Sequence, residues 1–236
     1  MDVFRRKEIK YLITAQQRKV LEEEFARRMK PDQFAHSSIR NIYYDTPDFR
    51  LIRKSLEKPV YKEKIRLRYY GEAHKEVFLE MKKKFEGIVY KRRITVPEQQ
   101  AVDFMAGRGN LPDTQIGREL EYFRNFYRDL QPQVFLCYER DSWCGVQDPG
   151  LRITIDEEIC YRVTDLDNTE LLNGEAILEP GTALMEVKAE YAIPLWLTEL
   201  LARERISKVS FSKYGKAYWR ELERKLSEKR GYHYVG

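Results

Sequence analysis

Two neighbouring stretches of the sequence, residues 61–70 and 76–84, alternate charged with apolar side chains. A period of two is typical of a β-strand, whose successive side chains point to opposite faces of a sheet. One face of these strands would carry Lys62, Lys64, Arg66, Arg68, Phe78, Glu80, Lys82 and Lys84. The fold must therefore accommodate cations that lie side by side on two strands.

Other stretches repeat this alternation, at residues 3–12, 133–141, 151–156 and 184–190. Their charged positions are Arg6, Glu8, Lys10, Arg140, Arg152, Asp156, Glu186 and Lys188. Residues 88–96 also have the composition of a strand, but Lys91, Arg92 and Arg93 place charge on both faces, so its register stays open.

The simplest explanation is an antiparallel sheet with one buried and one solvated face. Against it, the polar faces consist almost entirely of Arg, Lys and Glu, and like charges opposite each other across strands are unfavourable. If the sheet closes into a barrel, the charged faces line a lumen and the apolar faces point outward beneath helices. Such a cationic lumen is stable only with an anion inside it.

Helices are predicted between and after the strands. They cover residues 15–30 (begun by Thr14 as N-cap), 98–106, 117–129, 194–204 and 215–229. An extended segment around residues 39–52 contains a turn at Thr46-Pro47-Asp48. Because no linker, repeat or low-complexity tract interrupts the chain, we expect a single α+β domain over residues 1–236.

Composition narrows the class of protein. With 236 residues, 42% of them hydrophobic, the chain can bury a sizeable core. The 43 Lys+Arg and 38 Asp+Glu leave a net charge of only +5, so the placement of charge matters more than its sum. Three cysteines without C-x-x-C spacing suggest neither a disulfide framework nor a zinc site. We expect a soluble, cytoplasmic protein, since neither a signal peptide nor a membrane-length apolar run of about 20 residues is evident.

Clustered cations with a few carboxylates indicate phosphate chemistry. Arginine forks bind phosphate oxygens, lysines add compact charges, and carboxylates can hold Mg²⁺ or Mn²⁺ that bridges to phosphate. No P-loop, G-x-G-x-x-G or G-x-S-x-G motif occurs. His36, His74 and His233 fall on a predicted turn, a loop and the tail, where we expect surface residues. The residues alone therefore predict a site for a multiply charged phosphate chain and a divalent metal.

Eight motifs in order resemble the VTC-type polyphosphate polymerase domain of the triphosphate tunnel metalloenzyme (CYTH-like) superfamily. They are RRKEIKY, NIYYDTPDF, KIRLRYY, FLEMKKK, KRR, RITID, MEVK and SFSKYGKAY. The resemblance spans nearly the whole chain. It implies a closed eight-stranded antiparallel β-barrel, the triphosphate tunnel, with a charged lumen and helices packed outside.

The resemblance also implies roles for individual residues. Phosphate ligands and catalytic cations would be Lys10, Arg66, Arg68, Lys82, Arg152 and Lys213. Further substrate contacts would come from Arg6, Lys64, Arg92 or Arg93, Arg140, Arg162, Lys188 and Ser212. Glu186 resembles the metal-binding glutamate, with Glu8 and Glu80 as further metal candidates for Mn²⁺ or Mg²⁺. The implied reaction transfers the γ-phosphoryl group of ATP to polyphosphate or a pyrophosphate primer.

One departure separates this chain from the tunnel hydrolases. They carry E-x-E-x-K on the first strand, whereas Arg6, Glu8 and Lys10 form R-x-E-x-K here. A cation in place of a metal-binding acid favours the polymerase branch. The sequence shows neither the SPX domain nor the membrane segments of the eukaryotic polymerases, so a pore would require a membrane-protein partner; the oligomeric state stays open.

Two alternatives remain at this stage. The first is a tunnel triphosphatase, in which Glu8 or Glu80 would hold a water through the metal. The second is a non-catalytic binder of polyphosphate or single-stranded RNA, in which Tyr43, Tyr44, Tyr69 and Tyr70 would stack on bases. We expect these tyrosines to serve in packing instead, and no nucleic-acid partner.

Overall fold

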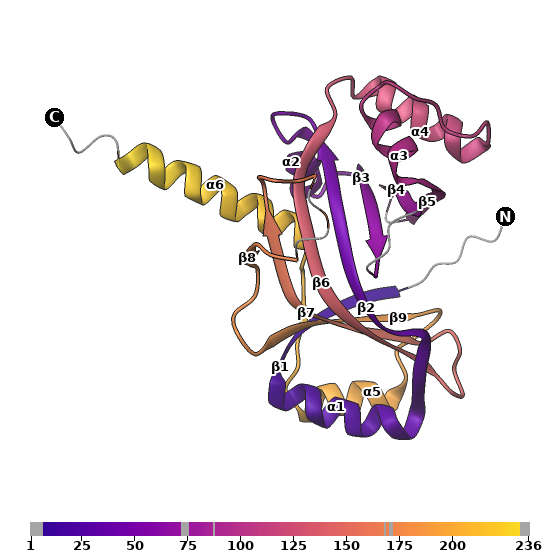
Figure 1. The fold of residues 1–236 in the computed structure, drawn as a ribbon. Coiled ribbons are helices and arrows are strands. Elements are labelled where there is room, and N and C mark those ends of the chain that lie inside the picture. Colours follow the sequence, from indigo (N-terminus) through magenta and orange to yellow (C-terminus); the bar gives the residue numbers. More distant parts are fainter. Residues whose placement is uncertain (1–6, 72–75, 87, 168, 170–171, 232–236) are drawn as a thin grey trace. The chain divides into compact units, whose positions relative to one another are not determined.

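The structure is a computed structural model that describes residues 7–71, 76–86, 88–167, 169 and 172–231. Its helices are α1 (Ala15–Arg28), α2 (Arg50–Leu56), α3 (Glu98–Met105), α4 (Gln115–Phe126), α5 (Leu195–Arg203) and α6 (Lys213–Gly231). Its strands are β1 (Lys7–Thr14), β2 (Met29–Asp45), β3 (Tyr61–Tyr70), β4 (Glu76–Phe85), β5 (Ile88–Pro97), β6 (Gln131–Gly145), β7 (Arg152–Arg162), β8 (Glu175–Ala176), β9 (Thr182–Ala189) and β10 (Lys208–Val209). The predicted α+β class is confirmed (Figure 1).

The strands form one sheet with the hydrogen-bonded order β10-β1-β9-β7-β6-β2-β3-β4-β5, and β8 pairs with β7. The pairs β1–β9, β3–β4, β4–β5 and β7–β9 are antiparallel. Since β8 and β10 have two residues each, the described residues contain eight longer strands, the number that the resemblance implies. Over the described part of the chain this path is open, so closure into a barrel stays a prediction.

The chain divides into two compact units. Unit 1 comprises residues 1–39, 137–160 and 178–211, and unit 2 comprises residues 40–136, 161–177 and 212–236. Strands β2, β6 and β7 contribute residues to both units.

In unit 1, the apolar face of the sheet packs against α1 and α5, which lie on the same side of β1 and β9 (Figure 1). This core contains Tyr11, Ile13, Leu21, Phe25, Met29, Leu151, Ile153, Ile155, Ala183, Met185, Val187, Ala189, Leu197, Leu200, Leu201 and Ile206. Helix α1 begins as predicted, because Thr14 and Gln17 cap each other's backbone N–H groups in a capping box. The residues that alternate with the core strand positions are therefore left to form a charged face.

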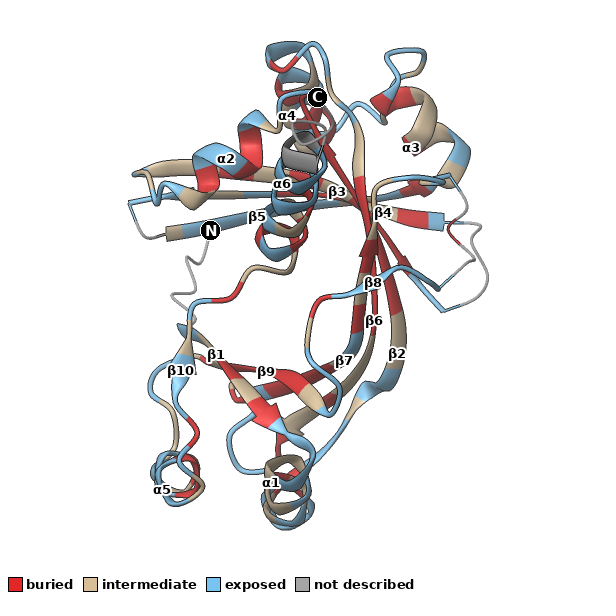
Figure 2. Ribbon diagram, turned by 90° about the vertical axis from the view of Figure 1, so that its left-hand side faces the viewer, coloured by how far each residue is buried: buried red, intermediate tan, exposed pale blue. Residues whose placement is uncertain are grey.

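In unit 2, the apolar positions that alternate with the cations of β3 and β4 are fully buried. They are Ile65, Leu67, Tyr69, Val77, Leu79 and Met81. Figure 2 shows the ribbon coloured by burial. Helices α3 and α4 lie beside β4 and β5. Burying each large aliphatic side chain contributes roughly 1.5–3 kcal/mol, and this fixes which face of the strands carries the cations.

The structure departs from the predicted local structure at two places. The first helix was expected to reach residue 30, but α1 ends at Arg28 and β2 begins at Met29, so residues 29–38 are strand. Helix α2, which follows the predicted turn, was not predicted. The turn at residues 47–48 and the strands at 61–70, 76–84 and 88–96 are confirmed to within one residue. Residues 3–6 of the first expected strand lie outside the described residues.

Candidate active site

The cations of unit 2 lie in register across three strands. Lys64 on β3 is opposite Lys82 on β4, and Lys82 is opposite Lys91 on β5. The next row places Arg66 opposite Glu80 and Glu80 opposite Arg93. We call this surface the cation face; it consists of Lys62, Lys64, Arg66, Arg68, Glu80, Lys82, Lys84, Lys91 and Arg93.

Glu80 is the acidic centre of the cation face. Its side chain is only 3% exposed and accepts bonds from Arg66 Nε at 3.0 Å and Arg93 Nε at 2.9 Å. Lys91 Nζ lies 3.0 Å and Arg68 Nε 3.7 Å from its oxygens. Burial alone would raise the pKa of Glu80, but the charges of Arg66, Arg68 and Lys91 outweigh it and the pKa is strongly lowered. Glu80 is therefore ionised at neutral pH.

Polar side chains of neighbouring elements orient the two arginines of β3. Arg66 donates to the Tyr43 hydroxyl at 2.7 Å, and Arg68 donates from Nε to the Asn41 side-chain oxygen at 3.0 Å. Arg68 also donates to the Tyr70 hydroxyl at 3.1 Å. The guanidinium groups are thus held in fixed positions, as bidentate recognition of an oxyanion requires.

The start of α6 adjoins the same face. The Ser212 hydroxyl accepts a bond from Lys64 Nζ at 3.1 Å and another from the backbone N–H of Gly215 at 3.1 Å, so Ser212 caps the helix that Lys213 begins. Tyr214 stacks on Tyr43 with ring centroids 4.5 Å apart. The N-terminus of this 19-residue helix therefore lies beside the lysine row, and helix N-termini favour anions.

The lysines are crowded by like charge. Burial lowers the pKa of Lys62, and the neighbouring charges of Lys84 and Lys82 lower it further. Burial also lowers the pKa of Lys91, although Glu80 partly opposes this effect. Two like charges about 6 Å apart repel by roughly 3 kcal/mol at an effective dielectric constant of about 20. A polyanion on the cation face would relieve this repulsion.

Unit 1 carries a second charged surface, which we call the mixed-charge face; it consists of Glu8, Lys10, Arg140, Arg152, Asp156, Glu186 and Lys188. Registers place Lys10 opposite Glu186, and Lys188 between Glu8 and Arg152. Lys10 Nζ lies 3.0 Å from Glu186 and 3.6 Å from Glu8, and Lys188 Nζ lies 3.6 Å from Glu186. Burial lowers the pKa of Lys188, while Glu186 opposes the shift.

The arginines of the mixed-charge face are bound to carboxylates. Arg140 makes a bidentate pair with buried Asp156, at 2.5 and 2.7 Å. Arg152 pairs with Asp32 at 2.7 Å, and its side chain is half-exposed. Both arginines lie where the sequence predicts, but an incoming phosphate would have to share them with these acids.

The structure bears on three of the predicted roles, the first of which, Arg92 or Arg93, the sequence left open. Arg92 lies on the opposite face from Arg93 and pairs with Glu119 of α4 at 2.9 Å, so Arg93 is the member of the pair on the cation face. Arg162 donates to backbone oxygens of Asp165 and Asn173 and lies over the ring of Phe135 at 3.7 Å, which assigns it to the support of a loop.

The third role is that of Glu80 as a metal candidate, which stays a prediction. The oxygens of Glu80 contact four cations, and those of Glu186 contact Lys10 and Lys188. Arg6 lies outside the described residues.

Glu186 and Glu8 could hold a metal ion only together with the phosphate groups of a bound substrate. Both carboxylates approach the same lysine, Lys10, whereas no trio of His, Cys, Asp or Glu within the described ranges is placed to hold a metal by itself. Mg²⁺ and similar ions are commonly held by one or two carboxylates plus substrate phosphates. The residues of unit 1 fit that shared mode of binding and not an all-protein cage.

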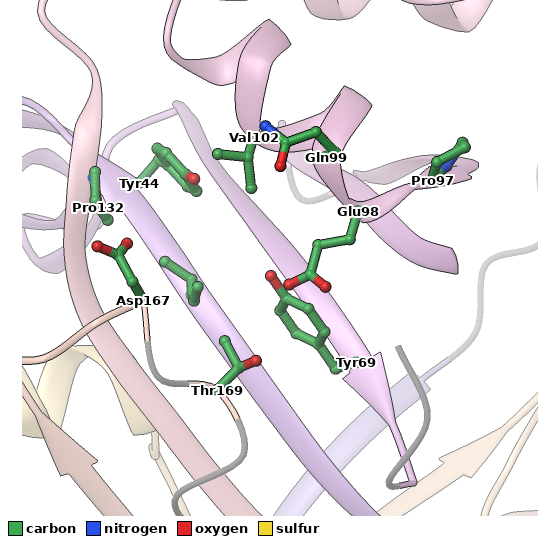
Figure 3. Close-up of a pocket in the computed structure, with 10 residues that line it drawn as sticks. Tyr44, Tyr69, Pro97, Glu98, Gln99, Val102, Pro132, Asp167 and Thr169 are labelled. Carbon is green, nitrogen blue, oxygen red and sulfur yellow. The ribbon is translucent and has the colours of Figure 1, made fainter. Parts of the chain in front are cut away.

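A cavity of about 460 Å³ lies on the other face of the unit 2 sheet (Figure 3). Its lining includes Tyr69, which alternates along β3 with the residues of the cation face, and also Tyr44 of β2, Glu98 and Asp167. Of its ten lining residues, none is a lysine, arginine or histidine. It is therefore not a phosphate site.

The sequence of this chain also matches a known protein family. The family model for the VTC domain matches residues 5–220. The chain belongs to the VTC domain family. No curated protein sequence matches it significantly.

Two solved structures share the fold of this VTC domain. A candidate adenylate cyclase from Bacillus halodurans aligns with a TM-score of 0.56 and 17% identity, over 87% of this chain and 92% of its own. A candidate adenylyl cyclase from Hippeastrum, described as having a dominant triphosphatase activity, aligns with a TM-score of 0.52 and 18% identity, over 91% and 94%. At such identities the likeness concerns the fold alone.

Sequence analysis missed several residues of this site. Tyr43 and Asn41 support the arginines, and Lys91 completes the lysine row. The motif NIYYDTPDF contains the first two, but nothing in it marks them as partners of β3. None of the helices within the described residues has the length and apolar character needed to cross a membrane.

Proposed function

We propose that this VTC domain is a metal-dependent phosphotransferase that moves the γ-phosphoryl group of ATP onto a growing polyphosphate chain. The observation that carries the proposal is the lysine row Lys64, Lys82 and Lys91 beside the arginine row on the cation face. Three lysines in one row offer more positive charge than a single phosphate needs, and a chain of several phosphates could contact all of them. The closed barrel expected from the sequence belongs to the proposal, since each charged face would line a lumen if the sheet closes.

In this proposal Arg66, Arg68 and Arg93 bind and orient the reacting phosphates, and the lysines hold the neighbouring ones. Glu186, with Glu8, would hold Mg²⁺ or Mn²⁺ together with phosphate oxygens, and the ion would supply charge neutralisation. The terminal oxygen of the acceptor chain attacks the γ-phosphorus, the bond to the β-γ bridging oxygen breaks, and ADP leaves. That acceptor oxygen is ionised at neutral pH, so no protein base is needed.

A triphosphatase is the second candidate. It is supported by the paired carboxylates Glu8 and Glu186 around Lys10, which could orient a water through a shared metal, and by the activity named for the Hippeastrum protein. RNA binding has weaker support, because Tyr43, Tyr44 and Tyr69 are buried and only Tyr70 of the four named tyrosines, 38% exposed, could stack on a base.

Product analysis separates the candidates. The full chain is incubated with γ-labelled ATP, Mn²⁺ and a pyrophosphate primer, and the products are resolved on a gel. Long labelled chains are the expected result. Labelled orthophosphate without chain growth would favour the triphosphatase, and absence of turnover with tight polyphosphate binding would leave a non-catalytic binder.

A further inference from the structure

Two cysteines of unit 1 lie next to each other on neighbouring strands. The sulfur atoms of Cys137 on β6 and Cys160 on β7 are 2.9 Å apart, and the residues are not disulfide-bonded. A disulfide has an S–S distance of about 2.05 Å, so closing the bond requires a movement of about 0.9 Å. The third cysteine, Cys144, instead lies 3.7 Å from the carbonyl oxygen of Lys30.

Strand β7 has an irregular backbone beside this pair. Arg140 and Asp156 form a side-chain ion pair across the same two strands. Between Asp156 and Cys160, Glu158 has a φ of 50°, the left-handed conformation that an inserted residue in a strand can adopt. A bulge at Glu158 would turn Cys160 toward Cys137.

We propose that Cys137 and Cys160 are a redox-active dithiol that closes to a cross-strand disulfide on reaction with a low-molecular-weight disulfide. Cys160 is half-buried and Cys137 is 3% exposed, so Cys160 is the thiol that the oxidant meets. This inference is independent of the proposed phosphate chemistry.

The reaction has two exchange steps. The Cys160 thiolate attacks one sulfur of the small disulfide, forms a mixed disulfide and expels one thiolate. The Cys137 thiolate then attacks the Cys160 sulfur and expels the second thiolate. The protein loses two protons and two electrons, and the oxidant gains them as two thiols.

The disulfide would fasten β6 to β7 in the hairpin that carries Arg140 and Arg152 of the mixed-charge face. Such a cross-link restricts the unfolded chain, because it closes a loop between two cysteines that are 23 positions apart in the sequence. We expect a loop of this length to raise the melting temperature by about 5–10 °C.

The full chain is tested by incubation with oxidised glutathione, alkylation of the remaining thiols and peptide mapping by mass spectrometry. We expect one cross-linked peptide pair, Cys137 with Cys160, an alkylated Cys144, and a rise in melting temperature that dithiothreitol reverses. Cys144→Ser should behave as the wild type, whereas Cys160→Ser should lose both the cross-link and the rise. Recovery of all three thiols as alkylated residues, or a disulfide that includes Cys144, would overturn the proposal.

Discussion

Replacing Glu80 with Gln removes the one carboxylate among the cations of β3, β4 and β5. In the wild-type protein the buried contacts are those with Arg66 and Arg68, whose side chains are 22% and 8% exposed. Lys91 and Arg93 are 47% and 39% exposed, so solvent screens their contribution. Removing one partner of a buried ion pair costs about 3–5 kcal/mol, and we expect Glu80→Gln to cost about 3 kcal/mol of unfolding free energy.

An added phosphate chain should reverse much of that loss. Tripolyphosphate that binds only the folded protein stabilises it by about 2.7 kcal/mol at a concentration a hundred times its Kd. The gain should be larger for Glu80→Gln than for the wild type, because the ligand supplies the missing negative charge. Urea unfolding in low salt, with and without tripolyphosphate, measures both effects.

The pH dependence provides an independent check. The pKa of Glu80 is lower in the folded protein than its ordinary value of 4.5, so its ionised form stabilises the fold above pH 4.5. This stabilisation is lost as the pH falls from 4.5 toward the lower folded pKa. The difference in stability between wild type and Glu80→Gln should therefore stay constant near neutral pH and narrow in acid.

Glu119→Gln is the matched control, since the Glu119 side chain, which pairs with Arg92, is 26% exposed against 3% for Glu80, and its loss should cost no more than about 1 kcal/mol. A Glu80→Gln protein that unfolds within about 0.5 kcal/mol of the wild type, with the same response to tripolyphosphate, would refute the reasoning.

Further predictions concern binding and turnover. Lys82→Ala should weaken tripolyphosphate binding at least about tenfold in calorimetry without loss of stability, because it relieves repulsion, whereas Lys83→Ala on the opposite face should change binding little. Arg93→Ala should slow turnover of labelled ATP and Arg92→Ala should not; equal effects would contradict the register. Glu186→Gln should abolish the dependence of turnover on added Mn²⁺, and an unchanged metal titration would remove Glu186 from the proposed site.

Much of the fold could be predicted because local and tertiary signals agree. In β3 and β4 the apolar positions Ile65, Leu67, Tyr69, Val77, Leu79 and Met81 recur with a period of two and are all fully buried, so periodicity located the strands although Glu63 and Lys83 interrupt the pattern. Thr14 and Gln17 have the spacing of a capping box, and α1 begins there. The sequence signals of such elements are local, so they can be predicted without knowledge of the tertiary structure.

The elements that escaped prediction depend on distant partners. Helix α2 follows Phe49, which has a φ of 59° and provides no side-chain cap. The Thr46 hydroxyl accepts from the N–H of Arg50, and buried Asp45 accepts from Leu51 and Ile52 and also from the Tyr214 hydroxyl of α6. A helix of seven residues that needs such a remote partner leaves little trace in its own sequence.

The site was predictable in its chemistry but not in its details. The motif KRR places charge on both faces of β5, and only the pairing of Arg93 with Glu80 determines which arginine joins the cation face. The sequence likewise places Glu80 among cations without deciding between a metal ligand and a counter-ion. That choice depends on three-dimensional contacts with Arg66 and Lys91.

The most direct test of the central claim is lysine footprinting. The full chain is acetylated briefly with and without tripolyphosphate, and the modification of each lysine is measured by mass spectrometry. We predict protection of Lys64, Lys82 and Lys91 of the cation face, with Lys83 modified equally in both samples. Equal modification of all four lysines, or protection of Lys83 alone, would contradict the assignment of the cation face as the phosphate site.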